Sequence, residues 1–369
     1  MSFYAIMERY ADFNFEAFFD RVSGADVARV LALEKLEALD FLTLLSPAAM
    51  DYLEPMAQKA RQLTVQYFGR TIQLFIPLYI ANHCANQCAY CGFNRANAIE
   101  RRKLTLEEIE AEARAIAATG MRHLLVLTGE AREVTPMAYI EAALRLLKKY
   151  FASVSIEMFP MQEDEYRRLK AAGVDGLTLY QEVYDRQIYH QVHLAGPKTD
   201  YRFRLEAPER GARAGFRAVN IGALVGLGEK RREVFFTGLH ARYLDDRYLA
   251  TEIGVSLPRF NPAEGDFQPR YPANDREFVQ FLLALRLFLP RAGITVSTRE
   301  RAAFRDRLMH LGATRFSAGS CTGVGGYARP DRRDTPQFEI SDTRDVDQVV
   351  RAIVAQGYQP VYKDWDVIA

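Results

Sequence analysis

Three of the four cysteines lie close together in the chain, as Cys84, Cys88 and Cys91 in the order CxxxCxxC. Cysteine thiolates favour soft metal centres such as zinc, copper(I) and iron-sulfur clusters. A structural zinc ion usually takes four protein ligands, and this loop offers three, because Cys321 lies 230 residues further along the chain. We therefore expect a 4Fe-4S cluster with one iron left open for a small molecule. A zinc knuckle or three incidental thiols are the alternatives.

Tyr90 stands between the second and third cysteines, where an aromatic ring can lie against a nucleobase. This arrangement, CxxxCxxC with an aromatic residue before the last cysteine, resembles the signature of the radical S-adenosylmethionine (SAM) superfamily. The resemblance implies that the open iron chelates the amino and carboxylate groups of SAM. It also implies that an electron from the cluster cleaves SAM to methionine and a 5'-deoxyadenosyl radical.

The composition places this cysteine loop in an ordinary globular protein. The chain has 369 residues, 49% of them hydrophobic, and a formal net charge of +1. There is no basic block, so we expect neither nucleic acid nor a membrane surface as the main partner. We see no signal-peptide core and no apolar run near the roughly 20 residues of a membrane span. Clustered cysteines fit a reducing compartment, and we expect a cytoplasmic protein.

The sequence pattern of the elements that must position the cysteines changes near residue 70. Residues 1–70 have helical periodicity and predict an N-terminal helical extension, while residues 71–369 alternate short apolar runs with amphipathic segments. That alternation is typical of βαβ units and a parallel sheet. The expected strands are 74–80, 123–127, 153–158, 176–180, 218–225, 252–257, 293–297 and 315–318. Eight such units predict an α/β fold, a TIM-type (β/α)8 barrel with a short C-terminal tail; a doubly wound open sheet is the alternative.

Local signals mark several helix ends in this region. Thr105 and Glu108 form a predicted capping box, and Thr135 precedes Pro136 as an expected N-cap before a proline at the first helical position. Glycines 120, 173 and 215 are expected to end three helices, because glycine readily adopts the positive φ of a helix C-terminus.

In a barrel of this kind the active site lies at the carboxyl ends of the strands. Almost every expected strand here ends in polar or glycine-rich sequence, which indicates a ligand cavity at one face. The strand-end residues that we select are Gly129, Glu130, Glu157, Gln181, Glu182, Gly226, Arg299, Ser317 and Ser320.

Part of this set is assigned to the cofactor by the resemblance. Gly129 and Glu130 resemble the second-strand element that holds the amino group of SAM, and Gly226 lies in a segment similar to the one that passes under the adenine. Arg204 stands where related enzymes keep an arginine for the SAM carboxylate, although Arg202 is a neighbouring candidate. The full expected cofactor-binding set is Tyr90, Gly129, Glu130, Glu157, Gln181, Glu182, Arg204 and Gly226.

Most of the candidate substrate contacts come from the last third of the chain. We expect Arg299 to point into the mouth of the barrel, where an unpaired cation needs an anion such as an amino-acid carboxylate. A structural ion pair with Glu300 or Glu252 is the alternative for this arginine. The other candidate substrate contacts are Ser317, Ser320 and Tyr79.

Several stretches together resemble one family, the radical SAM aromatic amino-acid lyases, and most closely the tyrosine lyases (2-iminoacetate synthases) of thiamine thiazole biosynthesis. They occur in family order, within about residues 65–366, at 77–82, 91–95, 127–130, 180–182, 297–300, 317–320, 325–327 and 359–366. The resemblance implies that the radical takes a hydrogen from the amino group of L-tyrosine and that the Cα–Cβ bond then breaks. The products would be dehydroglycine (2-iminoacetate) and p-cresol, with 5'-deoxyadenosine and methionine. A flavodoxin- or ferredoxin-type reductant and thiazole synthase are the implied partners.

Three other functions stay open from the sequence. A hydrogenase-maturation-type tyrosine lyase carries a C-terminal extension with a second cysteine-ligated cluster, and the ligands for it are not expected here because the chain stops three residues after Asp366. A tryptophan lyase shares the same core. A non-catalytic iron-sulfur or zinc scaffold would keep the cysteines but has no need of Arg204, Arg299 and the polar strand ends.

Three potentially reactive side chains receive no predicted role. Cys321 is expected to be a small buried thiol. His190 and His193 lie in a segment after the fourth strand, where we expect them to be solvated.

Overall fold

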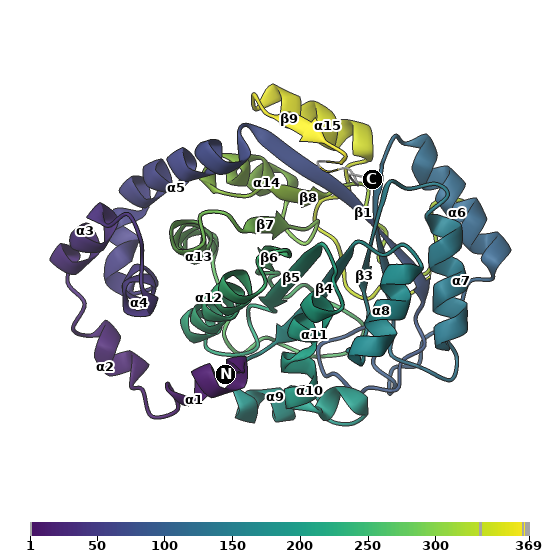
Figure 1. Ribbon diagram of the computed structural model, residues 1–369, viewed down its shortest axis with the longest axis horizontal. Helices are drawn as coiled ribbons and strands as arrows, with labels where there is room; N and C mark the ends of the chain where they lie inside the picture. Colours follow the sequence, from purple (N-terminus) through teal and green to yellow (C-terminus); the bar gives the residue numbers. More distant parts are fainter. Residues whose placement is uncertain (1, 332–333, 364, 366–369) are drawn as a thin grey trace.

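The computed structural model describes residues 2–331, 334–363 and 365. Its centre is a closed barrel of eight parallel strands, in which β1 pairs with both β2 and β8 (Figure 1). The strands are β1 (Thr71–Ala81), β2 (His123–Thr128), β3 (Ser153–Glu157), β4 (Gly176–Glu182), β5 (Ala218–Ala223), β6 (Glu252–Ser256), β7 (Gly293–Val296) and β8 (Arg315–Ser317). The predicted barrel is confirmed, and closure excludes the open doubly wound sheet.

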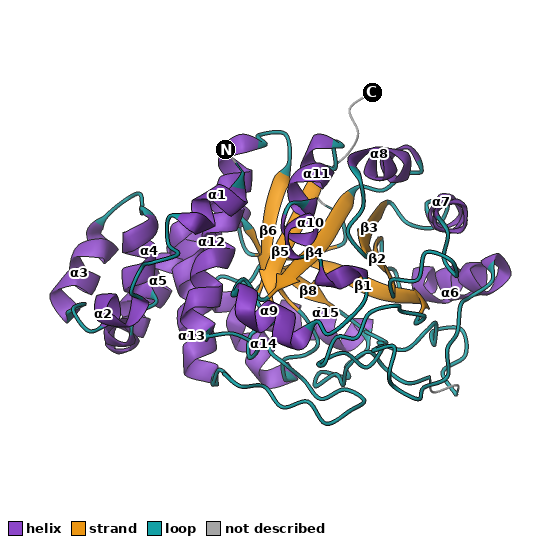
Figure 2. Ribbon diagram, turned by 90° about the horizontal axis from the view of Figure 1, so that it is seen from below, coloured by secondary structure: helices purple, strands orange, loops and turns teal. Residues whose placement is uncertain are grey.

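Helices surround the barrel (Figure 1). They are α6 (Leu106–Ala118), α7 (Met137–Leu147), α8 (Glu163–Ala171), α9 (Arg186–Val192), α10 (Tyr201–Leu205), α11 (Ala207–Arg213), α12 (Lys230–Arg247), α13 (Asp275–Phe288), α14 (Ala302–Leu308) and α15 (Val346–Ala355), with short 3-10 turns η2 (Pro197–Thr199) and η3 (Met309–Leu311). Each strand therefore buries apolar side chains outward against a helix, which leaves its carboxyl end free for loops. Figure 2 shows the longer loops on the side toward which β4, β5 and β6 point.

Most predicted helix ends agree with the structure. The Thr105 side chain and Glu108 form a reciprocal capping box at the start of α6. Glycines 120, 173 and 215 have φ of +82°, +103° and +85° just after α6, α8 and α11. The Thr135 prediction is wrong: Pro136 is the N-cap of α7, and the Thr135 hydroxyl donates to the Ala131 carbonyl instead. A local hydrogen bond within the preceding turn thus replaces the expected cap.

The N-terminal segment consists of α1 (Phe3–Glu8), α2 (Phe15–Phe19), α3 (Gly24–Ala32), α4 (Ala38–Leu44), η1 (Pro47–Tyr52) and α5 (Leu53–Phe68). Helices α3 and α4 lie outside α12 and α13 (Figures 1 and 2). Phe41 stacks on Phe288 at a ring-centroid distance of 4.4 Å, and the Gln280 amide donates to the Leu44 carbonyl at 2.9 Å. We propose residue 70 as the boundary of this extension, because α5 ends at Gly69 and β1 begins at Thr71.

One strand was not predicted. The C-terminal β9 (Gln359–Val361) pairs with the first residues of β1 outside the barrel. Residues 364 and 366 of the C-terminal stretch that carries part of the resemblance lie outside the described residues. No helix in the described part of the chain is both long and apolar enough to cross a bilayer.

Candidate active site

The cysteine loop follows β1 and is held by backbone hydrogen bonds to two distant segments. Ala85 N–H donates to the Glu130 carbonyl after β2 at 2.7 Å, and Gln87 N–H donates to the Ala195 carbonyl after α9 at 2.8 Å. A Cβ on Gly129 would lie 2.3 Å from the His83 carbonyl oxygen, so the turn after β2 touches the cysteine loop. Only glycine allows this approach, which explains Gly129 by packing as well as by its expected cofactor role.

The three cysteines are free thiols that fit an iron-sulfur cluster. Burial raises the pKa of Cys88 to about 12, so its thiolate needs a positive centre, which iron supplies. No set of three or more His, Cys, Asp or Glu residues in the described chain could hold a single metal ion. A 4Fe-4S cube is a different kind of site, since each of its ligating thiolates binds a different iron. The Gln337 amide donates to the Cys91 sulfur at 3.8 Å, a contact that sequence reasoning missed.

Tyr90 is fixed by a histidine. Its hydroxyl lies 2.8 Å from His193 Nε2, and His193 Nδ1 lies 2.8 Å from the Tyr189 carbonyl. Burial lowers the pKa of His193 to about 2, so the ring is neutral, with Nδ1 donating and Nε2 accepting. The prediction that His193 is solvated is wrong, because its side chain is 2% exposed; His190 is exposed as expected. This arrangement holds the Tyr90 ring beside the cysteines.

A buried ionic cluster lies at the end of β4. Glu182 accepts from Lys198 Nζ at 2.8 Å and from Arg204 Nη2 at 3.3 Å. Its φ is +72°, a conformation that is costly for a residue other than glycine and is common at functional sites. Burial raises the pKa of Glu182, but the two cations outweigh it and hold the pKa below its ordinary value. Arg204 is therefore the inward arginine, whereas Arg202 pairs with Glu206 at the surface.

Glu130 joins this cluster to the cysteine loop. Its carboxylate accepts from Asn86 Nδ2 at 2.7 Å, and Asn86 Oδ1 accepts from Lys198 N–H at 2.7 Å. Sequence reasoning missed Asn86 and Lys198, since Asn86 occupies an unspecified position of the CxxxCxxC motif and Lys198 belongs to no recognisable pattern. The loop, the turn after β2 and the segment after α9 thus form one hydrogen-bonded unit around the expected cofactor position.

Two other expected cofactor residues, Gly226 and Gln181, lie at or after strand ends. Gly226, after β5, has φ of +126° and its carbonyl accepts from Tyr271 N–H at 2.9 Å. Gln181 is 3% exposed, and neither atom of its amide group has a partner among the described residues. A buried primary amide without partners is costly, and Gln181 is not among the residues that line the cavity next to Tyr180.

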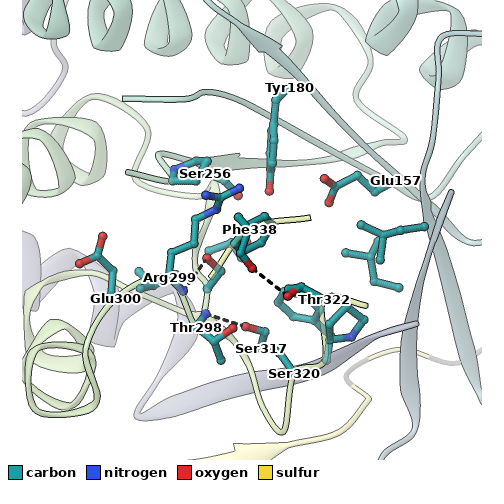
Figure 3. A pocket seen from close by; sticks show the side chains of 18 of the residues that line it. Glu157, Tyr180, Ser256, Thr298, Arg299, Glu300, Ser317, Ser320, Thr322 and Phe338 are labelled. Atoms are coloured by element: carbon teal, nitrogen blue, oxygen red, sulfur yellow. Dashed lines mark hydrogen bonds between the residues drawn. The ribbon is translucent and has the colours of Figure 1, made fainter. Parts of the chain in front are cut away.

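A cavity lies inside the barrel near the carboxyl ends of the strands (Figure 3). Its walls include Phe75, Tyr79, Leu125, Leu127, Glu157, Tyr180, Ser256, Arg299, Ser317, Ser320, Thr322 and Phe338. Arg299 reaches into it, with its guanidinium carbon 3.3 Å from the centre of the Phe338 ring. None of the ion pairs in the described part of the chain includes Arg299. The alternative ion pairs fail, because Glu300 binds Arg259 and Glu252 binds Arg217 and Arg315.

The other expected substrate contacts line the same cavity. Ser317 Oγ accepts from Thr298 N–H at 3.0 Å, which leaves its hydroxyl hydrogen to donate elsewhere. The Ser320 hydroxyl is buried and has no partner among the residues described. The Tyr79 hydroxyl donates to Gln337 Oε1 at 2.8 Å. Because Gln337 also contacts Cys91, this tyrosine connects the cavity with the cysteine loop.

Glu157 lies in this cavity, across from Arg299 (Figure 3). Burial and, secondly, the Glu182 carboxylate raise the pKa of Glu157 to about 7. A carboxyl group with this pKa can hold or release a proton near neutral pH. Glu157, which we expected to contact the cofactor, thus lies in the wall of the cavity that also contains Arg299.

Comparisons with known proteins identify the family of the chain. The chain matches the Radical SAM superfamily over residues 78–237 and the Biotin and Thiamin Synthesis associated domain over residues 256–359. It is 41% identical over 350 residues to the 2-iminoacetate synthase of Salmonella typhimurium, with 94% of this chain and 93% of that protein covered. The 2-iminoacetate synthase of Escherichia coli gives the same identity and coverage.

A solved structure shares the fold. The FeFe-hydrogenase maturase HydG from Carboxydothermus hydrogenoformans has a TM-score of 0.85 and 31% sequence identity, over 98% of this chain and 82% of that one. The 41% identity to the two 2-iminoacetate synthases over nearly the whole chain, together with the cysteine loop and the barrel, identifies the family. The chain belongs to the 2-iminoacetate synthases of the radical SAM superfamily.

Proposed function

We propose that this lyase cleaves the Cα–Cβ bond of L-tyrosine to 2-iminoacetate (dehydroglycine) and p-cresol, for thiamine thiazole biosynthesis. Radical SAM enzymes use SAM and an iron-sulfur cluster, and we assign the cluster to Cys84, Cys88 and Cys91. The observation that carries the proposal is Arg299, a guanidinium without an ion pair among the described residues, in a cavity that Tyr79 and Gln337 connect to Cys91.

The polar side chains of the cavity suit an amino acid. Arg299 can bind the substrate carboxylate through two parallel hydrogen bonds. Ser320 and Ser317 lie in the same wall and can donate to the same carboxylate. The Tyr79 oxygen can accept from the substrate amino group, since its own hydrogen is given to Gln337. These contacts would place the amino group of the substrate on the side of the cavity nearest the cysteine loop.

The remaining walls suit the aromatic ring and keep water out. Phe75, Leu125 and Leu127 supply apolar surface, and Glu157 can share a proton with a phenol oxygen. When bound, the cluster and SAM supply a primary carbon radical that removes a hydrogen atom from the substrate. Such a radical attacks nearly any C–H bond within reach, so the enclosed cavity must present one hydrogen and exclude the others.

The test is an anaerobic turnover of cluster-reconstituted protein with SAM, a strong reductant and tyrosine. Mass spectrometry should find p-cresol and 5'-deoxyadenosine in matching amounts. If 5'-deoxyadenosine forms without p-cresol, tyrosine is not the substrate, and formation of cleavage products from tryptophan would make the enzyme a tryptophan lyase.

We further propose that the enzyme takes electrons from a flavodoxin- or ferredoxin-type protein and passes its product to thiazole synthase. The reason for direct transfer is chemical, since a free imine hydrolyses in water to glyoxylate. Adding the synthase should therefore reduce the rate at which glyoxylate accumulates. An unchanged rate would contradict direct transfer.

A further inference from the structure

Gln337 lies behind the wall of the substrate cavity and touches two functional residues that are far apart in the chain. Its amide nitrogen donates to the Cys91 sulfur at 3.8 Å, and its amide oxygen accepts from the Tyr79 hydroxyl at 2.8 Å. Tyr79 is among the described residues that line the cavity, and Gln337 is not. One amide group therefore connects an expected cluster ligand with an expected substrate contact.

The backbone of the segment that carries this glutamine is fixed on both sides. The Gly92 N–H donates to the Gln337 carbonyl at 3.0 Å, and the Gln337 N–H donates to the Thr322 carbonyl at 2.9 Å. A Cβ on Gly92 would lie 2.6 Å from the Pro336 carbonyl oxygen, so the segment packs directly on the residue that follows Cys91. The Gln337 side chain therefore starts from a set position beside the cysteine loop.

The direction of both hydrogen bonds follows from the chemistry of the partners. A cysteine that binds iron is a thiolate, which can only accept a hydrogen bond, so the amide nitrogen must face Cys91. The amide oxygen then faces Tyr79 and has only lone pairs to offer. Burial raises the pKa of Tyr79 well above its ordinary value, so the hydroxyl keeps its hydrogen and donates it to Gln337. The lone pairs of the Tyr79 oxygen are left for another donor in the cavity.

At the sulfur end this contact favours negative charge. Burial raises the pKa of Cys91, and the hydrogen bond from Gln337 counteracts that rise. Cys91 is also the one cysteine of the loop whose sulfur receives a side-chain donor among the described residues. Hydrogen bonds to the sulfurs help to set the reduction potential of an iron-sulfur cluster. A donor at Cys91 would stabilise the cluster most when it holds the extra electron, and so raise that potential.

We propose that Gln337 is a positioning residue for both halves of the lyase reaction. Its hydrogen bond to Cys91 makes the cluster easier to reduce, and its hydrogen bond to Tyr79 turns the Tyr79 oxygen toward the amino group of the substrate. The inference rests on the proposed function, which supplies the cluster and the substrate amino group. An amino group held in this way has fewer orientations open to it, which favours removal of the intended hydrogen.

A redox titration of the reconstituted cluster, followed by electron paramagnetic resonance without SAM or tyrosine, tests the cluster half. At a fixed ambient potential Gln337→Met should lower the ratio of reduced to oxidised cluster about tenfold, a shift of about 59 mV for a one-electron couple, because methionine has no N–H for Cys91. Gln337→Leu is a second variant with the same expectation. Glu339→Met, at an exposed position two residues away, is the matched control and should keep the wild-type potential. Tyr79→Phe should keep it too, since the amide nitrogen stays in place.

The ratio of 5'-deoxyadenosine to p-cresol in turnover tests the substrate half. Gln337→Met and Tyr79→Phe should both raise this ratio at least about threefold over the wild type, because a substrate that is not held lets the radical react elsewhere. The double variant should be no worse than Tyr79→Phe, since Gln337 acts on the substrate through Tyr79. Glu339→Met should again match the wild type.

An unchanged potential in both glutamine variants would overturn the cluster half of the proposal, and so would an equal shift in Glu339→Met. Loss of the cluster from both glutamine variants would make Gln337 a structural residue and would also overturn it. An unchanged product ratio in Gln337→Met would overturn the substrate half. The wild type judges the function separately: if it forms no p-cresol, the lyase function and the substrate half are refuted, while the potential still decides whether Gln337 acts on Cys91.

Discussion

Arg299→Ala should raise the KM for tyrosine strongly while leaving the fold intact. In the substrate-free protein this guanidinium faces Phe338 and has no ion pair in the described part of the chain, so its counter-ion must come from a ligand. Removing one partner of an enclosed ion pair costs about 3–5 kcal/mol. Since about 1.4 kcal/mol corresponds to a factor of ten, kcat/KM should fall by about two to four orders of magnitude.

The loss should appear mainly in KM, because a carboxylate contact acts equally on bound substrate and transition state. The assay is p-cresol formation at varied tyrosine and saturating SAM. Arg301→Ala is a matched control, since Arg301 is two residues away and 70% exposed and pairs with Asp275 at the surface. Arg299→Lys should be intermediate, because lysine keeps the charge but not the fork of donors.

Thermal unfolding without substrate completes this test. An arginine with no carboxylate partner adds a desolvation cost to the folded state, so Arg299→Ala should unfold at the same temperature as the wild type or higher. If the variant unfolds at a clearly lower temperature and keeps a KM within about threefold of the wild type, the arginine is structural and the argument fails.

Three further predictions concern the cluster and the cavity. Cys84→Ala should reduce the iron content after anaerobic reconstitution from about four per chain to background. Cys321→Ala should keep the iron, because the Cys321 sulfur contacts only the Gly323 carbonyl among the hydrogen-bond partners described. Iron loss in both variants would refute the three-ligand assignment. Gly129→Ala should also lower the iron content, because the added methyl group would lie 2.3 Å from the His83 carbonyl oxygen, and an unchanged content would show that the loop can move aside. Burial raises the pKa of Glu157 from 4.5 to about 7, so between these pH values the folded protein holds a proton that the unfolded chain has released. The unfolding temperature of the wild type should therefore fall as pH rises from 4.5 to 7, and that of Glu157→Gln should fall less. An equal dependence of the unfolding temperature on pH in both proteins would refute this prediction.

The strands of the barrel could be predicted because each is a short apolar run between amphipathic helices. Every predicted strand overlaps an observed one, and the differences are confined to the ends, as between 218–225 and β5 (Ala218–Ala223). Strand β9 could not be predicted, since its three residues carry no periodicity and it exists only by pairing with β1. Closure likewise depends on β1 meeting both β2 and β8, which no local pattern encodes.

The candidate site could be predicted where residues lie at strand ends. Arg299 and Ser317 belong to this group, because the barrel rule places all strand ends at one face. The residues that were missed come from irregular segments and act over long sequence separations. His193 meets Tyr90 across 103 positions, and Gln337 meets Cys91 across 246. A contact of this kind leaves no trace in spacing or composition.

We propose Arg204 as the contact for the SAM carboxylate, on the hydrogen-bond donors that its guanidinium has left over. Lys198 and Arg204 both bind Glu182, and Glu130 belongs to the same buried hydrogen-bonded unit, so two carboxylates balance the two cations. Arg204 donates through Nε to the Tyr180 carbonyl and through Nη2 to Glu182, and its Nη1 has no hydrogen-bond partner among the described residues. A carboxylate from SAM would accept from that nitrogen while Glu182 keeps the guanidinium in place. The positive φ of Glu182 fits this arrangement, because it holds the Glu182 carboxylate between Lys198 and Arg204.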